Sequence, residues 1–240
     1  MLYVMSRRVC LSVIVLFVMF VIYFFDNGEK IIFCDVGQGD GMLVQRGMKQ
    51  LVVDTGPENG KMLACLGKYM PFWDKKIDGL IVTHKDADHR GGFDIVNKYY
   101  KIENIFEVED LKYEDKIRLG QVELKVLNSG PINDNDGSVV IELSWNNKKA
   151  LLLADTTVKT QNKLLWRKLL QKKYDLVKIS HHGSRDSYNE ELIMETRPFM
   201  AIISVGKNSY GHPAREVISS LEGLGVQIKR TDTEGNIIVN

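Results

Sequence analysis

Residues 83–92 constrain this chain more than any other stretch, because they place two histidines and two aspartates within six positions: His84, Asp86, Asp88 and His89. An apolar run typical of a buried strand comes before them, and a glycine pair with a helical pattern comes after. A strand end that opens into a loop can aim several side chains at one point. Imidazole nitrogens and carboxylate oxygens together suit Zn²⁺, Mn²⁺ or Fe. The pattern therefore favours a metal site over a charged surface loop.

Two later strand ends carry similar groups. An apolar run ends in Asp155, and a second one ends in the sequence Ser180-His181-His182-Gly183-Ser184. Taken alone, Asp155 could cap a helix and the histidines could cap a turn. Because strands come first in runs and then alternate with helices, we expect one compact α/β (α+β) domain, with two sheets and helices outside. In that layering the three strand ends converge on one face.

The N-terminal segment predicts a membrane anchor. Residues 9–25 contain no charge, Arg7 and Arg8 precede them, and Asp26 follows. The length is near the lower limit for a transmembrane helix, and the charge asymmetry predicts a cytoplasmic N-terminus with the remainder outside the cell membrane. The alternatives are a cleaved signal peptide, which the bulky end of the run disfavours, and a buried soluble helix. We divide the chain into residues 1–29, the tip, single-pass anchor and link, and residues 30–240, the globular domain.

Charge and cysteine content add two limits. The whole chain of 240 residues has a formal net charge of +1 and, without its first 25 residues, −1. Such a balance argues against a broad basic surface that coats nucleic acid. The spacing of Cys10, Cys34 and Cys65 matches neither a zinc knuckle nor a dense disulfide framework. We expect these cysteines to act as small buried hydrophobic residues.

With these motifs in view, the chain resembles the metallo-β-lactamase superfamily, and most closely the extracytoplasmic hydrolase domain of ComEC-type DNA-uptake competence proteins. The resemblance spans residues 30–240. Its motifs are residues 35–40, 53–56, 83–92, 153–155, 180–184, 208–213 and 230–235. It implies an αββα sandwich with a dinuclear metal site at one edge of the sheets.

The resemblance also implies roles for single residues. The implied metal ligands are His84 and Asp86 for one ion, Asp88 and His89 for the other, Asp155 as the bridge, and His181, which we favour over His182, to complete the set. Asp54 matches a buried aspartate that orients the site loops, although it could also be a simple turn residue. His212 and Lys207 lie where they could contact phosphate oxygens, and His212 could equally be a helix-start contact before Pro213.

The sequence departs from the family pattern at two places. Asp86 stands where the superfamily has histidine, and the separate histidine expected before Asp155 is absent, so Asn135 or Asp136 is the expected substitute. Replacing imidazole by carboxylate makes the first site harder. We therefore expect two divalent ions, Mn²⁺ or Zn²⁺, with Mg²⁺ as a further option.

These features predict a membrane-anchored, metal-dependent phosphodiesterase or nuclease acting on DNA. Asp88 or Asp155 would orient the attacking water, and His212 would stabilise the charged phosphate as a third catalytic residue. One alternative is an envelope phosphodiesterase acting on phosphocholine-type esters. Another is a non-catalytic metal-binding partner of a separate DNA-uptake channel, since a chain with one predicted membrane helix cannot itself be the pore. The expected partners are a phosphodiester such as DNA, the membrane, and that channel protein.

Overall fold

The computed structural model describes residues 9, 11–18, 28–130 and 135–240. Within these residues, no helix combines the length and the hydropathy that crossing a bilayer requires. Part of the predicted anchor, residues 10 and 19–25, lies outside the described residues, as do Arg7, Arg8 and Asp26 beside it. The transmembrane helix therefore stays a prediction.

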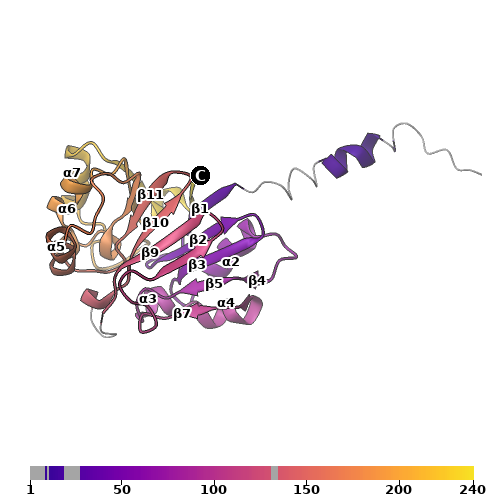
Figure 1. Cartoon of the computed structure of the whole chain (residues 1–240), viewed down its shortest axis with the longest axis horizontal. Coiled ribbons are helices and arrows are strands. Elements are labelled where there is room, and N and C mark those ends of the chain that lie inside the picture. Colours follow the sequence, from indigo (N-terminus) through magenta and orange to yellow (C-terminus); the bar gives the residue numbers. More distant parts are fainter. Residues whose placement is uncertain (1–8, 10, 19–27, 131–134) are drawn as a thin grey trace, which may run out of the picture.

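The first of two facing sheets is built mainly from the N-terminal half of the domain (Figure 1). Its strand order is β15 (Ile237–Val239), β1 (Glu29–Phe33), β2 (Gly41–Arg46), β3 (Lys49–Thr55), β5 (Gly79–Ile81) and β7 (Ile105–Phe106). Strands β1 to β3 form an antiparallel meander, whereas β3, β5 and β7 run parallel. The C-terminal strand β15 returns to pair with β1.

The second sheet has the same change of direction. Its order is β14 (Gln227–Arg230), β13 (Met200–Ile203), β12 (Leu176–Lys178), β11 (Lys148–Leu152), β10 (Val140–Trp145), β9 (Val122–Asn128) and β8 (Lys116–Leu119). Strands β8 to β11 are antiparallel and β11 to β14 are parallel. A separate parallel pair joins β4 (Lys76–Ile77) to β6 (Lys101–Ile102).

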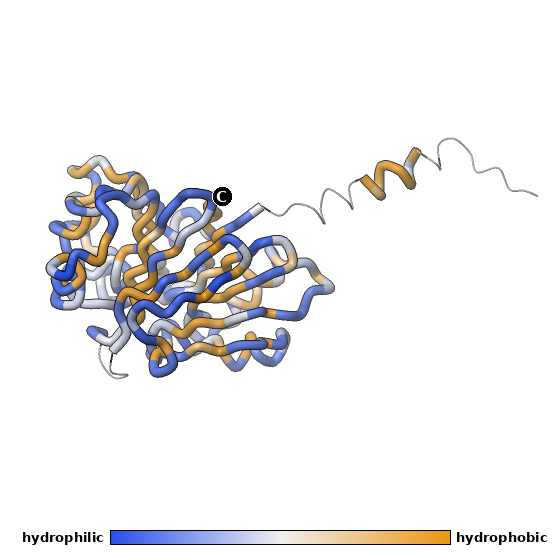
Figure 2. Tube along the Cα trace, in the orientation of Figure 1, coloured by the Kyte–Doolittle hydropathy of each residue, from blue (hydrophilic) through white to orange (hydrophobic). Residues whose placement is uncertain are grey.

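Alternating side chains create three apolar layers. In β1, Ile31 and Phe33 face the core between the sheets, while Ile32 faces the opposite way, toward α2 (Lys61–Tyr69) and α4 (Phe93–Tyr99). The alternation is visible as changing hydropathy along the strands in Figure 2.

On the other side, the second sheet packs against three helices, α5 (Val158–Trp166), α6 (Glu190–Thr196) and α7 (Arg215–Gly223). Short helices complete the fold: α3 (Ala87–Arg90), α8 (Thr231–Glu234), η1 (Asn135–Gly137), η2 (Ser180–Gly183) and η3 (Arg185–Ser187). The order helix, sheet, sheet, helix confirms the predicted αββα sandwich.

A disulfide bond joins Cys34, just after β1, to Cys65 in α2. The two residues are 31 positions apart in sequence, and their Cα atoms lie 6.0 Å apart. The prediction that these cysteines act only as buried hydrophobic residues is wrong for this pair. The reason is tertiary: both residues belong to the apolar layer between the first sheet and α2, and this layer brings them into bonding distance. Cys10 lies outside the described residues.

Candidate metal centre

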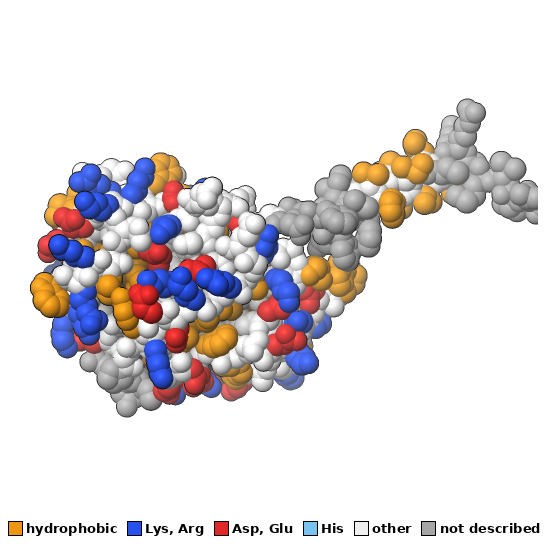
Figure 3. All heavy atoms as spheres, viewed as in Figure 1, with side chains coloured by type: hydrophobic (Ala, Val, Ile, Leu, Met, Phe, Trp, Pro, Cys, Tyr) orange, Lys and Arg blue, Asp and Glu red, His pale blue; other side chains and the backbone are white. Residues whose placement is uncertain are grey.

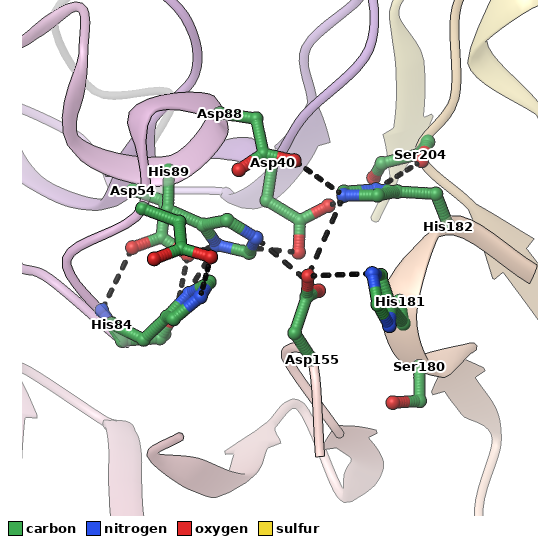
Figure 4. Close-up of polar contacts among 12 residues, drawn as sticks. Asp40, Asp54, His84, Asp88, His89, Asp155, Ser180, His181, His182 and Ser204 are labelled. Atoms are coloured by element: carbon green, nitrogen blue, oxygen red, sulfur yellow. Dashed lines mark hydrogen bonds and ion pairs between the residues drawn. The ribbon is translucent and has the colours of Figure 1, made fainter. Parts of the chain in front are cut away.

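The three strand ends that the sequence singles out meet at one edge of the sandwich. The loop after β5 leads into α3 with Asp88 and His89, Asp155 follows β11, and the histidine pair lies in η2 after β12 (Figure 4). Parallel strands present their carboxyl ends at the same edge of a sheet, which is why these loops come together. The edge thus receives one loop from the first sheet and two from the second.

Four side chains form the centre of the site. The nearest ligand atoms of Asp88, His89, Asp155 and His182 all lie within 4.8 Å of one another. His89 Nε2 is 3.2 Å from Asp155 Oδ1, and His182 Nε2 is 3.2 Å from Asp88 Oδ2. Asp88 is half-buried, and the other three are buried. Two imidazole nitrogens and two carboxylates make a donor set that suits a divalent transition metal.

The unsatisfied atoms of the site support cation binding. His89 Nε2 and Asp155 Oδ1 are fully buried, face each other, and form no hydrogen bond of good geometry. Buried polar atoms in folded proteins are nearly always satisfied. A cation held between these two atoms would satisfy both, so the residues present fit the expected metal.

The loop from the first sheet is held by a buried carboxylate. Asp54 accepts hydrogen bonds from Thr83 N at 2.8 Å and from Thr83 Oγ1 at 2.5 Å, and its Oδ2 lies 2.8 Å from His89 Nδ1. With the Nδ1 proton directed to Asp54, the Nε2 lone pair of His89 points to the centre. A carboxylate behind a ligating histidine commonly fixes its tautomer and ring orientation in this way.

The loop from the second sheet is held by backbone geometry instead. His181 and His182 have φ values of +47° and +54°, and Ala154, just before Asp155, has φ +47°. This left-handed region is costly for residues other than glycine. His182 Nδ1 donates to the carbonyl of Ser204 at 2.8 Å, so its Nε2 faces Asp88 and Asp155.

The histidine pair is arranged differently from the expectation. His182, expected as a substrate-binding or site-orienting residue rather than as the favoured ligand, joins the four-residue centre. His181, the expected ligand, is one third exposed, and its Nε2 lies 3.7 Å from Asp155 Oδ2 on the outer side. The positive φ at both positions turns the second imidazole inward, a feature that sequence spacing does not reveal.

His84 and Asp86, expected around the other ion, form a pair beside the centre. His84 Nε2 lies 3.0 Å from Asp86 Oδ2, and the His84 ring is 4.4 Å from the His89 ring between centroids. His84 is buried, whereas the Asp86 side chain is 66% exposed. Neither belongs to the compact group of four, so any second ion would be held at a more open position.

The expected histidine substitutes lie in η1. The Asp136 carboxylate accepts hydrogen bonds from Lys159 and Thr160 at 2.7 and 3.2 Å and contacts Thr157, all at the start of α5. Its oxygens are therefore engaged in holding a helix. Asn135 is half-buried, and its carbonyl accepts a hydrogen bond from Ser138 N at 3.1 Å. The structure does not bring either residue into the group of four.

One buried ion pair near the centre was missed by the sequence interpretation. Lys178 in β12 donates to Asp40 across 138 positions of sequence, and both side chains are buried. Asp40 Oδ1 also lies 3.5 Å from His182 Nδ1. Burial alone would raise the pKa of Asp40, but Lys178 and His182 outweigh it and lower that pKa. The available signal was a lysine inside an apolar strand, directly before the histidine pair.

Acidic neighbours also shift the histidines. Burial alone would lower the pKa of His89, but Asp155 and Asp54 hold it well above its ordinary value. In the same way, Asp155 and Asp40 outweigh burial and raise the pKa of His182 to about 9. Both shifts favour the protonated imidazoles, whereas a histidine binds metal only in its deprotonated form. Metal binding at this site must therefore displace protons.

The remaining predicted residues lie at the rim. The His212 ring is 5.8 Å from the His181 ring, and burial together with His181 and His182 lowers the pKa of His212. Lys207 is exposed. Both lie in the loop between β13 and α7.

Comparison with known proteins supports the family resemblance noted from the sequence. Residues 34–132 match the metallo-beta-lactamase superfamily. ComE operon protein 3 of Bacillus subtilis is 28% identical over 269 aligned residues, covering 93% of this chain and 34% of that protein. Competence protein ComA of Neisseria gonorrhoeae is 25% identical, covering 88% of this chain and 32% of that protein. The chain thus spans about a third of the length of these relatives.

A solved structure shows the same architecture. The metallo-beta-lactamase fold protein YhfI from Bacillus subtilis superposes with a TM-score of 0.62 at 12% identity, covering 88% of this chain and all of that one. The resemblance noted from the sequence is confirmed. Residues 34–132 thus match the metallo-β-lactamase superfamily, the relatives include competence proteins, and the His and Asp cluster suits a divalent metal, a combination that suggests a metal-dependent hydrolase.

Proposed function

We propose that this metallo-β-lactamase domain is a metal-dependent phosphodiesterase that cleaves DNA. The observation that carries the proposal is the gathering of Asp88, His89, Asp155 and His182 within 4.8 Å at the edge where the strands of both sheets end. The competence-related homologues favour DNA as the substrate. We propose two divalent ions, one at this centre and one beside it at His84 and Asp86.

The divalent ions would act as Lewis acids on the phosphodiester and make water a better nucleophile. The protein residues bind and position. Asp155 faces both His89 and His182. Asp88 is half-buried and borders solvent, where it can orient a water or accept its proton. His212 lies at the rim, and its lowered pKa favours the neutral imidazole, which can donate a hydrogen bond to a phosphate oxygen.

The surface charge is compatible with a local rather than a broad contact with DNA. On the face shown in Figure 3, Lys and Arg side chains are mixed with Asp and Glu. Large basic surfaces give non-specific affinity for DNA, and this face carries no such surface. Bound cations would instead supply positive charge where the phosphate reacts.

We further propose that the domain acts outside the cytoplasm, attached to the membrane by its N-terminal segment and working beside a separate channel protein. The Cys34–Cys65 disulfide supports this location, because such bonds persist in oxidising compartments and are rare in the cytosol. The uncharged run at residues 9–25 supports the attachment.

The test is hydrolysis by the purified full chain. Single-stranded and plasmid DNA and a phosphocholine ester are incubated with Mn²⁺, Zn²⁺ or Mg²⁺, and bound metal is counted by elemental analysis. We expect cleavage of DNA, its loss in Asp88→Asn, and its retention in Asp94→Asn, which changes an exposed aspartate in α4. Cleavage of the phosphocholine ester alone would favour the envelope function. Metal binding without any hydrolysis would favour a non-catalytic partner.

A further inference from the structure

An exposed aromatic side chain stands at the rim of the metal centre without a packing role. Tyr210 is 75% exposed, although large apolar rings are usually placed where they bury area. Its ring stacks on that of His212, with 5.9 Å between centroids and 28° between planes. The His212 ring in turn lies 5.8 Å from His181, whose Nε2 is 3.7 Å from Asp155. A row of rings therefore leads from the centre to solvent.

The loop that presents Tyr210 is rigidly cross-linked. Asn208 Oδ1 accepts hydrogen bonds from Tyr210 N and His212 N, both at 3.0 Å. Asn208 Nδ2 donates to the carbonyls of Gly206 and His212, both at 2.8 Å. The Asn208 amide thus makes its hydrogen bonds within this loop, and these bonds fix the backbone around the exposed ring of Tyr210. A loop backbone held in this way loses little conformational entropy when a ligand stacks on the ring that it carries.

We propose that Tyr210 is a nucleobase-stacking subsite, which holds the base next to the phosphate that reacts at the metal centre. The inference rests on the proposed function and names the part of the substrate that the rim recognises. A flat, exposed ring that borders a phosphate site suits single-stranded nucleic acid, because every base has a face that can stack on it. It suits choline less well, since quaternary ammonium groups are typically held in cages of several aromatic faces.

The decisive variants are Tyr210→Ala and the matched Tyr210→Phe, which keeps the ring. They are compared on a single-stranded oligothymidylate and on an oligomer of equal length whose sugars carry no bases. For Tyr210→Ala, we expect KM for the oligothymidylate to rise about tenfold with kcat little changed, and KM for the base-free oligomer to stay the same. Tyr210→Phe should behave as the unchanged chain.

Three results would overturn the subsite. The first is an equal rise of KM on both oligomers, which would indicate general loop damage. The second is an unchanged chain that binds the base-free oligomer as well as the oligothymidylate. The third is a rise of KM confined to a phosphocholine ester.

Failure of the proposed function is recognised separately. If the unchanged chain cleaves no phosphodiester, binding is measured with Mn²⁺ and an oligonucleotide that carries the fluorescent base 2-aminopurine. Quenching that Tyr210→Phe retains and Tyr210→Ala loses would support the stacking subsite even in a non-catalytic protein. Equal quenching by both variants would overturn it.

Discussion

The two sheets contribute to one site by different means. On the side of the first sheet, a buried side chain, Asp54, holds Thr83 and His89 through three short contacts. On the side of the second sheet, the backbone at Ala154, His181 and His182 adopts positive φ values and thereby aims the side chains. The first loop therefore depends on one carboxylate side chain, whereas the second depends on left-handed backbone conformations and on the hydrogen bond from His182 Nδ1 to the Ser204 carbonyl. Candidate ligands of one metal site can therefore be oriented by a buried carboxylate in one loop and by backbone conformation in another.

The largest loss of metal binding and activity should follow from removing Asp155, which lies beside candidate ligands from both loops. Asp155→Ala takes away the carboxylate that faces His89 and His182, so neither loop can compensate. We expect loss of bound metal and a fall in activity of more than about a hundredfold, because even outer partners of metal ligands contribute 10- to 100-fold. Elemental analysis and hydrolysis rates measure both. Near-normal metal content would show that Asp155 is not a ligand.

A smaller effect should follow from breaking only the first loop. Asp54→Asn keeps the shape but weakens the hold on His89, so metal affinity should fall about 10- to 100-fold, while the second loop keeps its structure. Competition with a chelator measures the affinity, and amide exchange of residues 180–184 reports on the second loop. Asp74→Asn, in the loop after α2, is the matched control and should change neither. If the second loop loosened as well, the two sides would not be independent.

Loss of the disulfide should destabilise the first sheet more than the second and should leave the activity little changed. The Cys34–Cys65 bond links β1 to α2, and the 31-residue separation gives an expected loss of about 2–4 kcal/mol in the double variant Cys34→Ala, Cys65→Ala. Denaturant unfolding measures this change. Hydrogen exchange should accelerate in β1 and α2 more than in β11 to β13. A uniform acceleration would mean that the domain opens only as one unit.

The smallest expected effect is a loss of folding stability at high pH, and it involves a hydrogen bond to a strand of the second sheet. Tyr174 donates to Glu142 Oε2 at 2.7 Å, and burial together with this carboxylate raises the pKa of Tyr174. A raised pKa in the folded state means that the stabilisation is complete below about pH 10, the ordinary value, and is lost as the pH rises above it. Unfolding followed from pH 8.5 to 11 should show this decline.

Tyr174→Phe provides the control for that profile. It should lose about 1 kcal/mol at neutral pH through the missing hydrogen bond and show a flatter profile above pH 10. Tyr99→Phe, an exposed tyrosine in α4, should leave the profile as it is. An identical slope in Tyr174→Phe and the unchanged chain would assign the alkaline loss to other groups.

Local pattern was sufficient to predict two sheets with helices outside and the meeting of the strand ends that carry Asp88, His89 and Asp155, and the family resemblance implied the αββα order. Apolar runs mark strands, and a polar group after a parallel strand falls at a common edge. Which of His181 and His182 points to the centre depends on backbone φ. Two adjacent histidines show no spacing in the sequence from which these φ values could be predicted. The Asp40–Lys178 pair and the Cys34–Cys65 bond are products of tertiary packing between segments far apart in sequence. A single sequence carries no direct signal for such pairs.

The pairing of β15 with β1 sets an order of events for making this domain. Ile31, Ile32 and Phe33 near its start are matched in register with Val239, Ile238 and Ile237 at its end. During synthesis, the outer edge of β1 therefore stays uncovered until β15 has left the ribosome. An uncovered edge is a template for pairing with other chains. A nascent domain of this topology consequently benefits from a holding factor during that interval, whereas the finished sheet ends in β15, a strand of only three residues.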